Sequence, residues 1–177
     1  TVELDLASRS ILDALGIELE DPADAMLDRL VAEFGMQFPT TRKFSTFARQ
    51  SLASHIRAED DPDIALEEWM KQEERLFRTL EKAIVEVRLK DGFDSVDSFV
   101  DFSLSVQNRR KSRVGHALEN HLEAVFQASH VQYQRGGKTE GNSKPDFLFP
   151  SAKVYHDSNV GSPPLQMLAA KSTCKDR

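Results

Sequence analysis

The sequence predicts a protein of the α/β (α+β) class, with a largely helical N-terminal half followed by the first part of a mixed central sheet flanked by helices. Apolar residues recur at helical spacing from the start of the chain to about residue 129. Beyond that point the apolar segments are short, at 131–135, 146–149 and 165–174, and glycine or proline pairs separate them. We therefore place a helical region at 1–104 and a sheet-containing core at 105–177. The sheet looks unfinished, and we expect its C-terminal part to be missing.

Start and stop signals delimit the helices of the first half. The pairs Asp21-Pro22 and Asp61-Pro62 each combine an N-cap aspartate with a proline at the first helical position. The helices that they begin end at Gly35 and Gly92. Other helices are expected over 5–15, which ends at Gly16, and over 40–54.

The long helix after Asp61-Pro62 carries a single apolar stripe, and Trp69 on that stripe is expected to lie in the core. Ser95 is positioned to cap the next helix, which runs towards the basic segment at 108–113. A further helix is expected over about 112–129.

Composition excludes some classes of protein. No apolar run approaches the roughly 18–20 residues of a membrane span, so no membrane association is expected. The single cysteine, Cys174, cannot form an intrachain disulfide, which suits a reducing, cytoplasmic setting.

The net charge of −6 is divided unevenly along the chain. Residues 1–104 carry 12 Lys and Arg against 23 Asp and Glu, a net charge of −11, whereas residues 105–177 carry 11 against 6, a net charge of +5. This asymmetry favours contact of the second half with a polyanion such as nucleic acid.

Two strands that are expected to be buried each carry one charge. Asp146 opens the segment KPDFLFP, and Lys171 follows the apolar segment LQMLAA. On adjacent strands an aspartate oxygen can bind Mg²⁺, and a lysine can orient the attacking water and offset charge on phosphorus. Phosphodiester hydrolysis needs these parts. The alternative is a solvent-facing aspartate at a strand end and an unrelated exposed lysine, because this spacing alone is not specific.

The neighbouring residues resemble a known family. Pro145-Asp146 before an apolar run, then an apolar strand ending in Lys171, resembles the PD-(D/E)xK nuclease pattern. The segments NRRKSRVGHALENHLEAVF, GNSKPDFLFP and MLAAKSTCKDR together are similar to the C-terminal catalytic domain family of the type II restriction endonuclease EcoRII. The resemblance is closest over 105–177, is supported by GFDSVDSFVDF at 92–102, and is weaker over 1–91. It implies a restriction-endonuclease-like fold and Mg²⁺-dependent cleavage of double-stranded DNA at a short, CC(A/T)GG-like site in a restriction–modification system.

The sequence departs from the nuclease pattern at one position. The acid usually found two residues before the lysine is replaced by Ala169, so a second carboxylate must come from elsewhere. Glu119 is the candidate, since it lies on the apolar stripe of its helix with Gly115 and Leu122. The alternative for Glu119 is a rim residue paired with a basic neighbour. We expect Glu123 to be solvated, and we expect a further acid beyond Arg177.

The C-terminal triplet suits base recognition. Lys175 and Arg177 can donate to guanine, and Asp176 can accept from cytosine. A similar triplet follows the catalytic lysine in related enzymes that cut at CC/GG-type sites. A charged turn, or for Arg177 a place at the scissile phosphate, is the alternative.

The basic segment is predicted to contact DNA phosphates at a helix start, with a solvated linker as the alternative; its cations are Arg109, Arg110, Lys111 and Arg113. Tyr155 matches a family tyrosine near the active site, and packing at the sheet edge is an equal interpretation. The symmetric target implies a homodimer. A competing interpretation is a DNA-binding or effector module without cleavage, such as a decayed or truncated endonuclease. A helical protein-interaction domain is a third.

Overall fold

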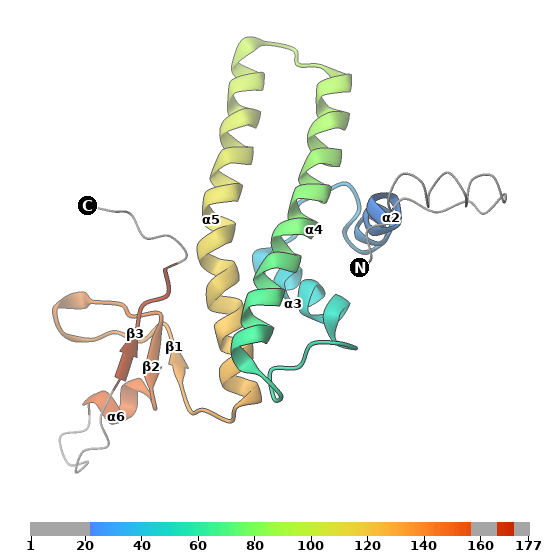
Figure 1. The fold of residues 1–177 in the computed structure, drawn as a ribbon. Coiled ribbons are helices and arrows are strands. Elements are labelled where there is room, and N and C mark those ends of the chain that lie inside the picture. Colours follow the sequence, from blue (N-terminus) through green and yellow to red (C-terminus); the bar gives the residue numbers. More distant parts are fainter. Residues whose placement is uncertain (1–21, 157–165, 172–177) are drawn as a thin grey trace, which may run out of the picture.

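The computed structural model describes residues 22–156 and 166–171 and has the expected mixed α/β character (Figure 1). Most of the described chain is helical, and a small sheet follows the helices. The elements in chain order are α2 (Pro22–Phe34), α3 (Thr41–Leu52), α4 (Pro62–Asp91), α5 (Val96–Ala128), β1 (Gln134–Arg135), the 3₁₀ turn η1 (Glu140–Asn142), β2 (Phe147–Phe149), α6 (Ala152–His156) and β3 (Gln166–Leu168). The helix expected over 5–15 lies outside the described residues.

Helices α4 and α5 form a long antiparallel hairpin that supports the other elements (Figure 1). The Asp61 side chain caps α4 as predicted, accepting from the amides of Asp63 and Ile64 at 3.1 and 3.0 Å. Gly92, with φ of 80°, ends α4, because glycine adopts this conformation without a steric penalty. Helices α2 and α3 pack against one side of the hairpin, and the sheet lies beside the C-terminal end of α5 (Figure 1).

Helix α5 is continuous over 33 residues, so the prediction of two helices meeting near residue 112 is wrong. It begins as expected at Ser95, whose side chain and backbone exchange hydrogen bonds with Ser98. The basic segment contains neither proline nor glycine, and arginine and lysine are good helix formers, so nothing interrupts the backbone there. The boundary placed between residues 104 and 105 falls within this helix.

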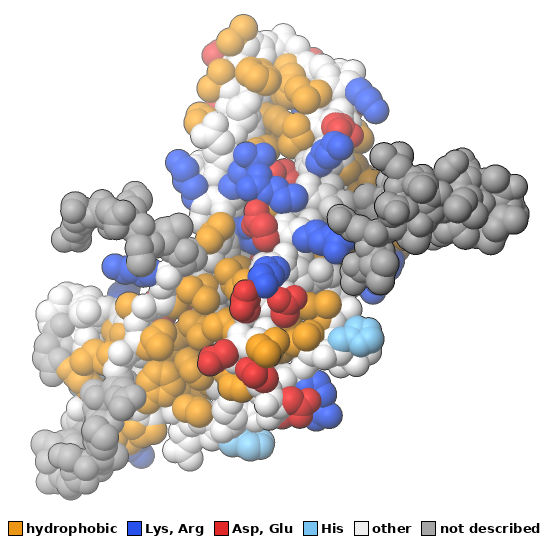
Figure 2. All heavy atoms as spheres, viewed as in Figure 1, with side chains coloured by type: hydrophobic (Ala, Val, Ile, Leu, Met, Phe, Trp, Pro, Cys, Tyr) orange, Lys and Arg blue, Asp and Glu red, His pale blue; other side chains and the backbone are white. Residues whose placement is uncertain are grey.

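Two apolar clusters hold the helices together. The larger one joins α2, α3 and α4 through Leu30, Phe44, Ala48, Leu76, Phe77 and Leu80. The smaller one contains Trp69, which is 6% exposed, as its place on the α4 stripe predicted. Fewer apolar side chains are buried at the end of the hairpin where α4 meets α5. Six of the ten large exposed hydrophobic residues of the described chain lie there, between Val87 and Leu104. Figure 2 shows apolar side chains at the far tip of the hairpin.

A buried ionic contact crosses from α4 to α5. Glu73 has no exposed side-chain surface, and its Oε2 atom lies 3.0 Å from Nε2 of the equally buried His121. The other carboxylate oxygen lies 3.6 Å from Nη1 of Arg113, whose side chain is 8% exposed. A buried carboxylate needs such partners because it has lost its hydration.

The described sheet contains three antiparallel strands in the order β1-β2-β3. Phe147 and Leu148 of β2 are fully buried, as a core strand requires. Phe126 of α5 packs edge-on against Phe147 and Phe149, with ring centroids 5.1 Å apart in each case. The strand expected over 165–174 is shorter, and a mixed sheet of restriction-endonuclease type remains a prediction. No helix in the described part of the chain has the length and apolarity needed to cross a membrane.

Replacing Glu73 with alanine is expected to lower the free energy of unfolding by about 3–5 kcal/mol, because the buried Arg113 loses a counterion and His121 loses its neighbour. Urea denaturation followed by circular dichroism measures the loss. Glu67→Ala, which removes an exposed contact with Lys71, is the matched control and should cost no more than about 1 kcal/mol. Equal losses in the two variants would contradict this account of the helix interface.

Candidate active site

Asp146 is fixed at the junction of β1, β2 and the segment after β3. Its carbonyl oxygen accepts from the amide of Gly136 at 3.0 Å. Its side-chain Oδ2 atom accepts from the amide of Ala170 at 2.7 Å. The preceding residue, Pro145, is buried, so the start of β2 is held on both sides.

Lys171 lies on the segment that neighbours this aspartate, directly after the residue whose amide binds it. Strands β2 and β3 pair with Phe147 opposite Leu168, and the same register continued by one residue sets Asp146 opposite Ala169, two residues before Lys171. Lys171 follows Ala170 directly and is exposed. Within residues 22–156 and 166–171 no ion pair joins Lys171 to Asp146, and Lys171 is exposed.

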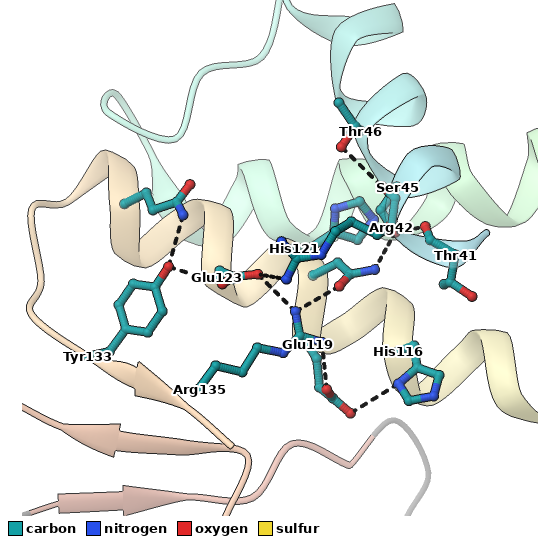
Figure 3. Close-up of polar contacts among 12 residues, drawn as sticks. Thr41, Arg42, Ser45, Thr46, His116, Glu119, His121, Glu123, Tyr133 and Arg135 are labelled. Carbon is teal, nitrogen blue, oxygen red and sulfur yellow. Dashed lines mark hydrogen bonds and ion pairs between the residues drawn. The ribbon is translucent and has the colours of Figure 1, made fainter. Parts of the chain in front are cut away.

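Three acidic and amide side chains of α5 surround Arg135 of β1 (Figure 3). Nη2 of Arg135 donates to Oε2 of Glu119 at 2.7 Å. Nη1 donates to Oε2 of Glu123 at 2.8 Å and to Oδ1 of Asn120 at 2.9 Å. Burial alone would lower the pKa of Arg135, but the hydrogen bonds to Glu119 and Glu123 outweigh it and raise that pKa. Arg135 therefore joins the sheet to α5 as a permanent cation.

The Arg135 cluster extends into α3. Arg42 donates to Oε2 of Glu123 at 2.9 Å, and Asn120 donates to Oγ of Ser45 at 3.1 Å (Figure 3). Because Gly136, the residue after Arg135, binds the backbone of Asp146, these contacts connect α3 and α5 to the strand that carries the aspartate.

Glu119 and Glu123 differ from what their sequence positions suggest. Glu119 is 19% exposed at its side chain and is paired with Arg135, with His116 Nδ1 3.6 Å from its Oε1 atom. The pairing matches the alternative of a rim residue with a basic neighbour, and a metal-binding role stays a prediction. The expectation that Glu123 is solvated is wrong, because its side chain is 17% exposed and lies between Arg42 and Arg135.

The basic segment lies in the middle of α5, so the prediction that it stands at a helix start with free backbone amides is wrong. Arg110 is paired with Glu81 of α4, its Nη2 atom 2.7 Å from Oε2. Arg113 is bound by Glu73 and Glu74. Arg109 and Lys111 are exposed, and the guanidinium of Arg109 lies over the ring of Phe38, 4.9 Å from its centroid.

The remaining predicted residues are less informative. Tyr155 lies in the short helix α6, partly buried, with its ring packed edge-on against His156 at 5.0 Å. Lys175, Asp176 and Arg177 lie outside the described residues. Arg135 was not predicted from the sequence, in which the glycine pair that follows it indicates only a break between apolar segments. No spacing in the sequence indicates its partners, which tertiary packing brings together.

The described part of this site offers one carboxylate, that of Asp146, as a ligand for a magnesium ion. Among the described residues no group of three or more His, Cys, Asp or Glu side chains could hold a metal ion. Magnesium in phosphate-processing sites is commonly bound by one or two carboxylates, with water and phosphate oxygens as the other ligands. Asp146 fits that requirement, because its Oδ2 atom is fixed by Ala170 and its Oδ1 atom has no hydrogen bond from the described residues.

Two comparisons with known proteins bear on this geometry. The family model described as EcoRII C terminal matches residues 77–177. The chain belongs to the EcoRII C-terminal family. The chain is also 41% identical over 150 residues, 84% of its length, to the type II restriction enzyme EcoRII of Escherichia coli. It spans 36% of that relative.

The EcoRII C-terminal match includes the whole of α5, the sheet, Asp146 and Lys171. It begins inside α4, after Glu73, so α2 and α3 precede it. Arg135 and its partners on α5 therefore fall in the family region, whereas Arg42 and Ser45 are supplied by the helices that precede it.

Replacing Arg135 with alanine is expected to lower the free energy of unfolding by about 1–3 kcal/mol, because Glu119, Glu123 and Asn120 lose a partly buried donor. Arg135→Lys should recover only part of the loss, since a point charge cannot reproduce the guanidinium fork. Urea denaturation provides the measurement. Arg57→Ala is the control, because the contacts of Arg57 are exposed and span 3.8 and 4.0 Å. A loss no greater than that of the control would show that Arg135 does not anchor the sheet.

Glycine-to-alanine changes at residues 137 and 115 are expected to have opposite signs. A Cβ at Gly137 would clash with Cδ1 of the buried Leu148, so Gly137→Ala should cost about 1–3 kcal/mol through overpacking of β2. A Cβ at Gly115 has no atom within 4 Å outside its own helix, so Gly115→Ala should stabilise α5 by about 0.5–1 kcal/mol. Thermal denaturation of both variants tests the pair. A stabilising change at residue 137 would contradict the packing of β2.

Proposed function

We propose that this chain is the first part of the catalytic core of a type II site-specific deoxyribonuclease. The enzyme would hydrolyse phosphodiesters of double-stranded DNA at a short, G·C-flanked, CC(A/T)GG-like site with Mg²⁺, in a cytoplasmic restriction–modification system. Membership of the EcoRII C-terminal family supports the class of enzyme. One observation carries the proposal for this chain. The carboxylate of Asp146 accepts a hydrogen bond from the backbone amide of Ala170, the residue before Lys171.

The two residues would divide the work at the scissile phosphate. Asp146 would hold Mg²⁺, which polarises a phosphoryl oxygen and lowers the pKa of a bound water. Lys171, exposed at the same edge of the sheet, would orient the attacking water and offset the negative charge that develops on phosphorus. Glu119 would assist as a second carboxylate only if it exchanged its contact with Arg135 for the metal.

DNA contacts are proposed for two groups of residues. Lys175, Asp176 and Arg177 would read neighbouring G·C pairs. Arg109 and Lys111 are exposed and are the members of the basic segment that we propose for phosphate contacts, whereas Arg110 and Arg113 hold α5 against α4. A symmetric target would require a homodimer, because the twofold symmetry of the protein mirrors that of the site.

A second candidate function is DNA binding without cleavage. It is favoured by Ala169, which leaves the sheet edge with one carboxylate where the nuclease pattern has two. The two candidate functions share the proposed DNA contacts. They differ only in whether Asp146 and Lys171 carry out cleavage.

In the full-length protein, Asp146→Ala and Lys171→Ala are each expected to reduce Mg²⁺-dependent cleavage about 10²–10³-fold or more, because each removes charge stabilisation at the phosphate. Plasmid cleavage measures activity, and a gel-shift assay in Ca²⁺ measures binding, which both variants should retain. Asp94→Ala and Lys138→Ala remove the same charges from exposed positions elsewhere and should cleave normally.

The 177-residue chain by itself is expected to cleave poorly. If the full-length protein binds DNA without ever nicking it in Mg²⁺, the non-cleaving module is the correct function. Full activity of Lys171→Ala would also refute the proposed role of that residue.

A further inference from the structure

The loop between β1 and β2 leads directly into Asp146. The loop is closed at its base, where the amide of Gly136 donates to the carbonyl oxygen of Asp146 at 3.0 Å. It is closed again nearer its tip, where the amide and the hydroxyl of Thr139 donate to the carbonyl oxygen of Ser143 at 3.0 and 3.3 Å. These bonds fix the backbone at both ends of the neck, which is the part of the loop between the two closures.

The side of the neck that leads to the aspartate carries Lys144. This lysine is two residues before Asp146, so the Cα atoms of the two residues are at most about 7 Å apart. Lys144 is exposed and Asp146 is partly exposed, whereas the residues that follow each of them are buried. This alternation turns Lys144 and Asp146 to the same, accessible side of the segment.

The proline between these two residues restricts the backbone of Lys144. A proline ring disfavours the helical region for the residue before it, and that residue is left extended. Pro145 is itself buried, which holds the segment against the rest of the protein. The direction in which the lysine leaves the backbone is therefore set before any ligand binds.

Lys144 differs from several exposed cations of the helical hairpin, which bind an acid one turn away. On α4, Lys71 lies 2.7 Å from Glu67, and Lys82 lies 3.8 Å from Glu86. Among the described side chains no carboxylate forms an ion pair with Lys144. Binding of an anion to this lysine therefore breaks no ion pair with the described side chains.

We propose that Lys144 binds a phosphodiester of the DNA strand that is cut, within two nucleotides of the scissile phosphate. The inference rests on the proposed function, because Asp146 marks the scissile phosphate only if it holds the metal there. Successive phosphates of one strand of a duplex are about 3.4 Å apart along the helix axis. A cation whose Cα atom is at most about 7 Å from that of Asp146 is thus one or two phosphates from the reaction.

The contact aligns the strand and takes no part in the chemical step. Phosphate contacts fix the register and the orientation of a duplex, and they carry no base specificity. Lys144 therefore acts when DNA binds, whereas Lys171 is the lysine proposed for the attacking water. Loss of Lys144 should raise KM for DNA about tenfold and leave kcat nearly unchanged, because one charge-assisted contact of the bound strand is lost.

Binding of short DNA duplexes by the full-length protein in Ca²⁺ tests the contact, with one phosphate of each duplex replaced by an uncharged methylphosphonate. Lys144→Gln is expected to weaken binding of the unmodified duplex about tenfold. At one position the methylphosphonate should weaken wild-type binding by a similar factor and leave the binding of Lys144→Gln unchanged. That position should lie within two nucleotides of the bond that the wild-type protein cuts in Mg²⁺.

Lys138→Gln is the matched control, because it removes the same charge from the other side of the same neck. The chain leaves strand geometry on that side at Gly136, which has a φ of 73°, and the carbonyl oxygen of Lys138 lies 3.2 Å from Nε2 of His156 in α6. An exposed charge without a direct contact is screened by salt, so Lys138→Gln should weaken binding less than about twofold. Neither variant removes an ion pair between described side chains, and both should melt at the wild-type temperature.

The outcomes separate this contact from the nuclease function. Equal losses of binding in Lys144→Gln and Lys138→Gln would overturn the proposal, because they would reveal only the general field of the loop. The proposal also fails if no methylphosphonate position becomes silent in Lys144→Gln, or if the silent position is more than two nucleotides from the cut. Either result leaves cleavage by the wild-type protein, and hence the nuclease function, intact. A protein that binds but never cuts would refute the nuclease function and the placement beside a scissile phosphate, whereas one silent position would still establish that Lys144 binds a phosphate.

Discussion

The contact of Glu73 with Arg113 and His121 is the constraint on which the arrangement of the other elements depends. It fixes how α4 and α5 lie against each other, because a fully buried carboxylate is tolerated only where its partners meet it. Once α5 is fixed at Arg113, the helical repeat determines where Arg109, before that residue, and Glu119, after it, are placed. The acidic partners of Arg135 are therefore presented by a helix whose position depends on this interface.

Polar contacts lead from that interface to the sheet, because Arg49 of α3 contacts the His121 ring and donates to the carbonyl of Asn120. Asn120 joins Ser45 of α3 to Arg135 of β1, and the residue after Arg135 binds the backbone of Asp146. The sheet itself is small, and a three-stranded sheet with strands of two or three residues needs support from a neighbouring helix. Phe126 supplies the apolar part of this support and Arg135 supplies the ionic part.

Local signals in the sequence predicted the elements well and the contacts between them poorly. The caps of α4 and α5, the burial of Trp69 and the placement of Asp146 beside the segment of Lys171 all follow from residue type and spacing. The continuity of α5 was missed because a dense run of cations resembles a linker until its acidic partners on α4 are known. Arg135 could not be found for the same reason, since its partners are separated from it by 12 to 16 residues and belong to another element.

The hydrogen bond between the Asp146 carboxylate and the amide of Ala170 gives this aspartate a structural role in addition to the catalytic role proposed for it. It stabilises the junction of two strands whether or not any reaction takes place. Selection for a folded protein would therefore retain an aspartate at this position even in a lineage that had lost catalysis. Lys171 makes no comparable contact within the described chain and is exposed. Among relatives, the retention of this lysine is thus the better marker of an enzyme that is still under selection for cleavage.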